Sequence, residues 1–205
     1  MLATAPHGDK IAEPLVGPVR DLAAVEQAAA TFLTALGIPA DTETTRHTAT
    51  RMASAYAEIL SPVAFQPTCF ENVKNYRDFI LARELPFRSI CAHHLMPFVG
   101  VADIGYLPGQ RLVGLSKLAR AMAWCAARPQ MQEELTVAVA DWVVEHLAPA
   151  GVGVMLAATH GCMTLRGACA AGSSVVTIAT RGSLVEDRAV RAEFMMLAGA
   201  AGGGR

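Results

Sequence analysis

The sequence predicts an α+β domain that follows a helical arm. Before residue 62, apolar residues recur at helical spacing; after it, short apolar runs and helical stretches follow the order strand, strand, helix, helix, strand, strand. Two helices between pairs of strands are typical of an antiparallel sheet with helices on one face. We therefore expect a mobile leader over residues 1–20, a helical arm over residues 21–62 and the main domain over residues 63–200.

The arm is expected to consist of two helices. Residues 21–36 carry an apolar stripe at helical period, and Gly37 and Pro39 stop it. A second helix is expected over about residues 42–60, where Met52 and Tyr56 lie four positions apart on one face. The two helices together are expected to form a helical arm.

In the main domain, strands and helices are separated by turn and cap signals. Pro108 and Gly109 mark a turn, Ser116 is expected to cap a helix, and Pro129 breaks that helix from the next. We expect strands over residues 84–91, 98–107, 151–159 and 174–180, and helices over residues 116–127, 130–147 and 187–197.

Composition excludes several classes of protein. The 205 residues carry a formal net charge of -1, so the chain lacks the basic field that attracts nucleic acid or anionic lipid. Charged residues, Pro or Gly interrupt every run of about 18 apolar residues, so no membrane-spanning helix is expected. The first ten residues lack the basic start and apolar stretch of an export signal. These features predict a cytoplasmic protein without nucleic-acid or membrane partners. The low charged fraction of 17% favours an oligomer whose subunits cover one another's apolar surface.

Cysteine and histidine gather in two short segments. Cys91, His93 and His94 follow a predicted strand, and His160 and Cys162 follow another about seventy residues later. An odd count of five cysteines without an export signal disfavours a disulfide framework and favours metal or thiol chemistry. Thiolate and imidazole are the ligands that zinc prefers, and three protein ligands plus a water make a catalytic site.

The residues alone leave open which of these groups bind the metal. There are more candidates than the three ligand places, so some imidazoles stay free for proton transfer. The remaining cysteines, Cys69, Cys125 and Cys169, are interpreted as small buried or half-buried residues.

Three segments carry a resemblance to a known family. The segments SICAHHLMPFVGVADIGYLPGQRLVGLSKLAR, RPQMQEELT and ATHGCMTLRG resemble the signature blocks of GTP cyclohydrolase I, in the same order and with similar spacing. The resemblance implies a tunnelling fold, in which an antiparallel four-stranded sheet carries two helices on one face. It also implies that subunits form rings and a homodecamer, with GTP bound at subunit boundaries.

The resemblance implies a role for each matching residue. Cys91, His94 and Cys162 match the zinc ligands, although such a ligand set also accepts ferrous iron. The residues that match catalytic positions are His93, His160, Ser116 and Gln132. The residues that match substrate-binding positions are Glu133 for the guanine edge and Lys117, Arg120, Arg166 and, in the arm, Arg51 for the ribose and triphosphate.

The implied reaction is the zinc-dependent hydrolysis of GTP at C8. Formate leaves and 7,8-dihydroneopterin triphosphate forms, the first step of tetrahydrofolate and pterin biosynthesis. Two alternatives stay open: a specialised purine-ring-opening homologue that feeds another pterin or deazapurine pathway, and a non-catalytic tunnelling-fold zinc protein.

At two positions the sequence differs from the motifs of the family, and two of the matching residues also have a purely structural interpretation. Ala92 stands where the family commonly has glutamate, and Ala49 stands where its arm motif has proline, which weakens the match around Arg51. Without the resemblance, Glu133 is interpreted as a carboxylate that stabilises the positive end of a helix dipole. Ser116 is interpreted as a helix cap.

Overall fold

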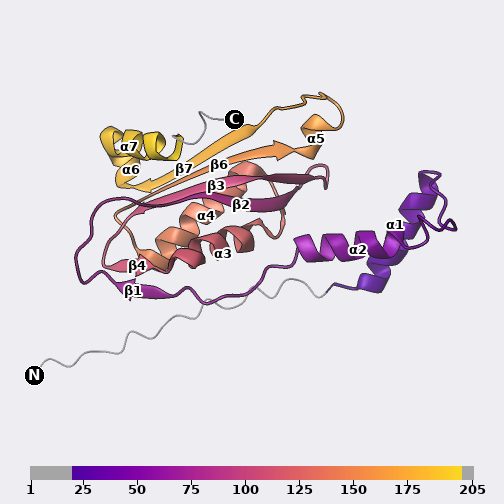
Figure 1. Cartoon of the computed structure of the whole chain (residues 1–205), viewed down its shortest axis with the longest axis horizontal. Coiled ribbons are helices and arrows are strands. Elements are labelled where there is room, and N and C mark those ends of the chain that lie inside the picture. The colour runs from indigo at the N-terminus through magenta and orange to yellow at the C-terminus, as the bar shows by residue number, and fades with distance from the viewer. Residues whose placement is uncertain (1–19, 200–205) are drawn as a thin grey trace, which may run out of the picture.

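The computed structural model describes residues 20–199, and its centre is a five-stranded sheet in the order β5-β2-β3-β6-β7 (Figure 1). The four long strands pair antiparallel: β2 (Ile80–Cys91), β3 (Pro97–Leu107), β6 (Gly151–His160) and β7 (Val175–Gly182). A separate two-stranded sheet joins β1 (Cys69–Glu71) to β4 (Arg111–Val113).

The expected sheet of four strands is confirmed, and a fifth short strand adds to it. β5 (Pro129–Gln130) pairs parallel with the end of β2. The buried amide of Gln130 donates to the carbonyl of Cys125 at 2.8 Å, which fixes these residues in an extended conformation. The following helix therefore begins at Gln132 and not at Gln130 as expected.

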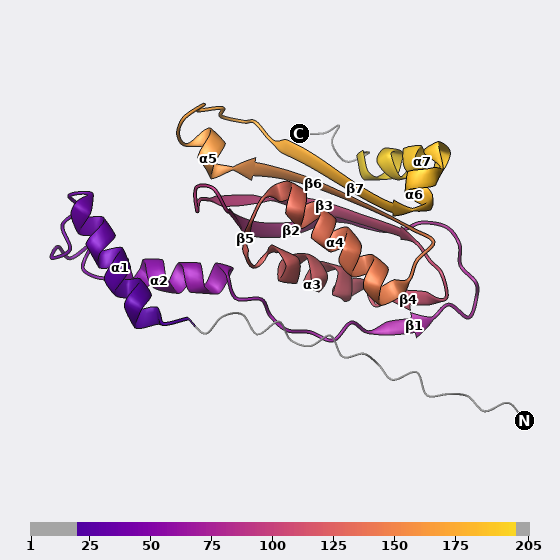
Figure 2. The same ribbon diagram turned by 180° about the vertical axis from the view of Figure 1, so that it is seen from behind.

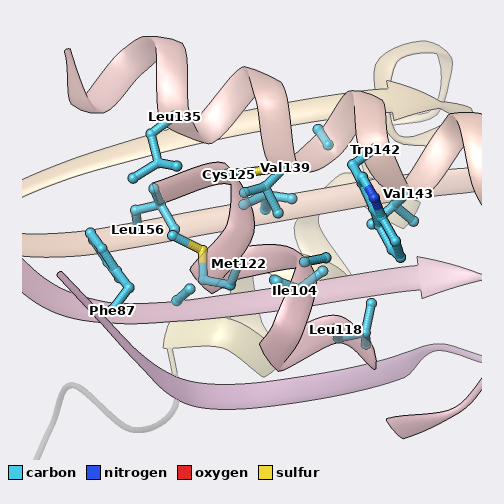
Figure 3. Packing of buried hydrophobic residues seen from close by; sticks show 14 of the residues in the cluster. Phe87, Ile104, Leu118, Met122, Cys125, Leu135, Val139, Trp142, Val143 and Leu156 are labelled. Carbon is cyan, nitrogen blue, oxygen red and sulfur yellow. The ribbon is translucent and has the colours of Figure 1, made fainter. Parts of the chain in front are cut away.

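Two helices, α3 (Leu115–Ala126) and α4 (Gln132–Leu147), lie side by side on one face of the sheet (Figures 1 and 2). This confirms the α+β arrangement expected from the order of the elements. Figure 3 shows Met122 of α3 and Val139 of α4 among the core side chains, with Ile104 of the sheet. All three are fully buried, which accounts for the apolar periodicity of both helices.

The other face of the sheet is covered at one end by α6 (Ser183–Glu186) and α7 (Arg188–Gly199). The ring of Phe194 lies against two glycines, Gly105 and Gly153. A Cβ atom built on Gly153 would lie 2.7 Å from that ring, so glycine is needed for α7 to pack there.

A bulge interrupts the pairing of β2 with β3. Ala82 pairs with Ile104 and Leu85 pairs with Ala102, so two residues of β2 oppose the single residue Asp103. Glu84 in this bulge has a φ of 52°, and its backbone N–H donates to Asp103 Oδ1 at 2.8 Å. The buried Asp103 carboxylate thus accepts a backbone N–H within the bulge, where the ladder is interrupted.

The arm projects away from the sheet and consists of α1 (Leu22–Ala35) and α2 (Thr48–Ile59) (Figure 1). Residues 42–47 form turns, so the expected start of the second helix was wrong by six residues. Within these turns the backbone N–H groups of Thr45 and Arg46 bond to the carbonyl of Thr42. Threonine hydroxyls there also bond to one another, which competes with helix formation.

Two contacts of α2 join the arm to the main domain. Glu58 pairs with Arg88 of β2 at 2.9 Å, and the Tyr56 hydroxyl donates to the carbonyl of Leu95 at 2.9 Å. Both partners of the ion pair are exposed, so the pair contributes little stability.

Ser116 does not cap α3, contrary to the expectation. Gly114 is the N-cap, in an extended conformation, and its N–H donates to the carbonyl of Thr68. This bond fixes where the chain enters the helix and places Ser116 inside the first turn.

The domain boundaries stay predictions. All but one residue of the expected leader, and residues 200–205, lie outside the described part of the chain. Over residues 20–199, none of the helices has the length and apolar character needed to cross a membrane.

Candidate metal and purine site

Cys91, His94 and Cys162 converge at one end of the sheet. Cys91 ends β2, His94 lies in the turn after it, and Cys162 lies in the short helix α5 (Gly161–Thr164) after β6. Their sulfur and ring nitrogen atoms all lie within 4.8 Å of one another. β3 separates the two parent strands in the sheet, so neighbouring strand ends bring the three groups together.

The turn that carries two of these groups is held by its own backbone. The N–H of Cys91 donates to the carbonyl of Met96 at 2.9 Å, and the N–H of Leu95 donates to the carbonyl of Cys91 at 2.9 Å. From β5, the carbonyl of Gln130 accepts the N–H of Ala92 at 3.2 Å. The spacing of Cys91 and His94 is therefore set before any metal binds.

The three groups fit zinc. Burial raises the pKa of the Cys162 thiol, and the neighbouring Cys91 raises it further, while Arg166 opposes the shift. Two thiols this close resist ionisation unless a cation compensates their charge, and a divalent metal supplies that charge. Two sulfurs and one imidazole leave a fourth position open, as in catalytic zinc sites.

His160 lies beside this group and is held on two sides. Its Nε2 lies 2.7 Å from Oε1 of Gln132, and its ring stacks on Phe98 with centroids 4.6 Å apart and planes 2° apart. Burial lowers the pKa of His160, and the negative charge of Glu133 opposes that shift. Its ring position is therefore fixed while its charge can change.

The other predicted residues at this end are exposed. His93 lies in the same turn as His94, with its ring edge-on to the His94 ring at 6.3 Å between centroids. Glu133 is exposed in the first turn of α4, and Arg166 is exposed just after α5. The charges of Glu133 and Arg166 act on His160 and Cys162 respectively, which places both near the metal group.

Four predicted residues are not brought to the metal group. α3 begins beside β4 and ends near Ser89, whose hydroxyl donates to the carbonyl of Ala126 at 2.7 Å. Its 12 residues span about 18 Å, so the start of the helix lies far from the metal end. Within residues 20–199, no hydrogen bond or ion pair links the metal group to Ser116, Lys117, Arg120 or Arg51.

The structure also adds residues that sequence reasoning did not identify. Thr136 and Thr177 hydrogen-bond around Gln132, and Phe98 stacks on His160. Thr136 follows Gln132 by four residues in a helix, a spacing that could have indicated the contact. Thr177 gave no such signal, because it meets Gln132 only through the pairing of β6 with β7.

Comparison with known proteins identifies a family that spans most of this chain. Residues 25–199 match the family model described as GTP cyclohydrolase I. The GTP cyclohydrolase 1 of Brevibacillus brevis is 42% identical over 181 residues, which cover 86% of this chain and 97% of the relative. That of Aquifex aeolicus is 39% identical and that of Bacillus subtilis 41% identical, covering 84% and 83% of this chain and 94% and 92% of the relatives.

Among solved structures, an archaeosine synthase QueF-Like in the apo form aligns over 52% of this chain and 94% of its own, with 17% identity and a TM-score of 0.39. That similarity is too weak to bear on function. The family model and the relatives each span most of the chain, so this protein belongs to the GTP cyclohydrolase I family.

Proposed function

We propose that this chain hydrolyses GTP at C8 and releases formate, giving 7,8-dihydroneopterin triphosphate, as a cytoplasmic enzyme of pterin biosynthesis. The observation that carries the proposal is the group Cys91, His94 and Cys162 beside His160. A structural zinc site closes its fourth position with protein, whereas this group offers three ligands and keeps imidazoles beside it.

Cys91, His94 and Cys162 would hold the zinc, which supplies Lewis acidity for attack of water on the purine. His160 gives a proton to purine N7, because attack of water at C8 breaks the C8–N7 π bond and its electron pair moves to N7, where the proton binds. Phe98 and Gln132 keep its ring in place during this transfer. The polar atoms of the Gln132 side chain all bond within the chain, so Gln132 acts through His160 and not on the substrate.

Glu133 selects the base. It is exposed at the start of α4, next to His160, where a carboxylate can accept from both N1–H and the N2 amino group of guanine. Adenine presents an acceptor at N1, which would leave that carboxylate unpaired. His93 is placed to exchange protons during opening of the ribose.

The triphosphate requires cations from two surfaces. Arg166 lies at the metal end, whereas Lys117 and Arg120 lie towards the start of α3, at the far end of the sheet. We infer that a neighbouring copy of the chain brings its Ser116, Lys117 and Arg120 to the metal end. Arg51 of the arm would extend the phosphate contacts, within the decamer implied by the family resemblance.

Incubation of the zinc-loaded protein with GTP tests the proposal. We expect one formate and one dihydroneopterin triphosphate for each GTP consumed, together with one zinc per chain. Formate with a different product would identify a specialised homologue. Full zinc occupancy without any formate would identify a non-catalytic zinc protein.

A further inference from the structure

The C-terminal end of α3 is tied by side chains to two strands of the sheet. A helix leaves its last carbonyls without partners inside the helix. At this end the carbonyl of Cys125 accepts from the side-chain amide of Gln130 at 2.8 Å. The carbonyl of Ala126 accepts from the hydroxyl of Ser89 at 2.7 Å. Ser89 belongs to β2 and Gln130 to β5, so both bonds cross from the helix to a strand.

Ser89 and Gln130 also bind each other. The amide nitrogen of Gln130 lies 3.3 Å from Ser89 Oγ. Because the hydroxyl hydrogen of Ser89 points to Ala126, its oxygen is left to accept from Gln130. Ser89 is 0% exposed and Gln130 is 5% exposed, so water does not compete for these bonds. The two side chains therefore form one buried network with the end of α3.

The same two residues adjoin the turn of residues 91–96, which we call the ligand turn. Ser89 precedes Cys91 by two positions in β2, so both side chains lie on one face of the strand. Gln130 is the register partner of Cys91, and its carbonyl accepts the N–H of Ala92 at 3.2 Å. The bonds of Cys91 to the end of the turn fix the shape of the turn. The bond from Gln130 ties that turn to another element of the domain.

We propose that Ser89 and Gln130 are positioning residues for the metal. β5 pairs with β2 over two positions, and the buried side chain of Gln130 anchors this short strand to the end of α3. β5 in turn holds the ligand turn, which carries the Cys91 thiol and the His94 ring. The inference rests on the proposed zinc site and extends it to residues that do not themselves bind the metal.

The polar character of the pair supports this role. Two apolar side chains could fill the same space without the cost of burying polar groups. Hydrogen bonds, however, fix the distance and direction between β2, β5 and α3, whereas apolar contacts allow these elements to slide. We therefore expect the pair to affect the geometry of the metal ligands as well as the stability of the fold.

Zinc binding in the absence of substrate tests the proposal. Gln130→Met keeps the length of the side chain and removes its hydrogen-bond donors. We expect zinc affinity, measured by competition with a chelator on the folded protein, to fall about 10- to 100-fold, the range for groups that orient metal ligands. In cobalt-substituted protein the visible absorption of Co²⁺ should shift, because it reports coordination geometry. A folded Gln130→Met protein with wild-type affinity and spectrum would overturn the inference.

Tyr106→Phe is the matched control. The buried Tyr106 hydroxyl accepts the N–H of Val113 at 3.1 Å, beside the start of α3 and away from the ligand turn. Its loss should lower the melting temperature but leave zinc affinity and the cobalt spectrum unchanged. Equal losses of zinc affinity in Tyr106→Phe and Gln130→Met would show a general loss of stability and overturn the inference.

Ser89→Ala gives an independent result, which decides the question if Gln130→Met does not fold. It removes one hydroxyl, and zinc affinity should fall about threefold or more. Unchanged affinity in Ser89→Ala would overturn the role of Ser89, and with no folded Gln130 variant it would overturn the inference. These measurements need no GTP, so absence of formate release by the wild type would refute the proposed function alone.

Discussion

At the metal end of the sheet, side chains hold one another in place, whereas no side-chain hydrogen bond or ion pair within residues 20–199 holds the predicted residues near the start of α3. His160 is fixed by Phe98 and Gln132, and Cys91 and His94 share a turn closed by backbone hydrogen bonds. By contrast, Ser116 and Arg120 are exposed. The residues proposed for the chemistry are thus preorganised within one chain, while under the proposed function those predicted to bind phosphate would need a second surface.

The largest effect is expected from removing a ligand at the metal end. Cys162→Ser should bind less than one zinc per chain and lose formate release, because a hydroxyl is a poor substitute for thiolate at this site. Zinc content and formate are measured on the same sample. A variant with full zinc and normal turnover would show that the metal end is not the reaction centre.

Base recognition should depend on charge at the same end. Glu133→Gln keeps the shape of the side chain but replaces one acceptor oxygen with a donor, so GTP binding should weaken by about 2 to 4 kcal/mol. Isothermal titration would measure this, and zinc content should not change. Affinity within threefold of the wild type would mean that Glu133 only complements the start of α4.

Co-expression of two variants, each defective at one end of the sheet, tests whether the two ends of different copies form one site. Cys162→Ser damages only the metal end and Lys117→Ala only the α3 end, so each homogeneous protein should be inactive. If sites form between copies, co-expression at equal amounts should restore about a quarter of wild-type activity, because each half is intact in half of the copies. No recovery in confirmed mixed oligomers would contradict a shared site.

The smallest effect is expected from the arm. Tyr56 donates to the carbonyl of Leu95, next to the proposed ligand His94, and Tyr56→Phe removes only this bond. We expect zinc transfer to a chelator to become about three- to tenfold faster, since groups that orient metal ligands tune affinity. Glu58→Gln, which breaks the other arm contact to Arg88, is the control and should not change the rate.

The two cysteine and histidine segments predicted a metal site from their chemistry alone, and the family resemblance selected its three ligands. Cys91, His94 and Cys162 stand at strand ends, and the structure brings all three together. The helices α3 and α4 and the four long strands were predicted from periodicity, with small errors at their ends.

Features that depend on distant contacts escaped prediction. The short strand β5 exists because Gln130 pairs with Cys91 of β2 and its amide donates to Ser89, and Thr177 reaches Gln132 only after β7 has paired. The cap of α3 was misplaced because the hydrogen bond of Gly114 to Thr68 joins residues that are separated in the sequence by four strands. The roles of individual site residues stay predictions until substrate binding is measured.

The bulge at Glu84 determines which residues of β2 lie on the face of the sheet that packs against α3 and α4. Ile80 and Ala82 contact the core under α3 and α4, and after the extra residue the odd positions Leu85 and Phe87, and finally Cys91, take over that side. In a regular strand of the same length, alternation would turn Cys91 to the opposite side of the sheet. The side of the sheet on which the proposed zinc ligand Cys91 lies is thus decided seven residues upstream, so deletion of one bulge residue would turn its thiol away from His94 and Cys162 without any change in the motif itself.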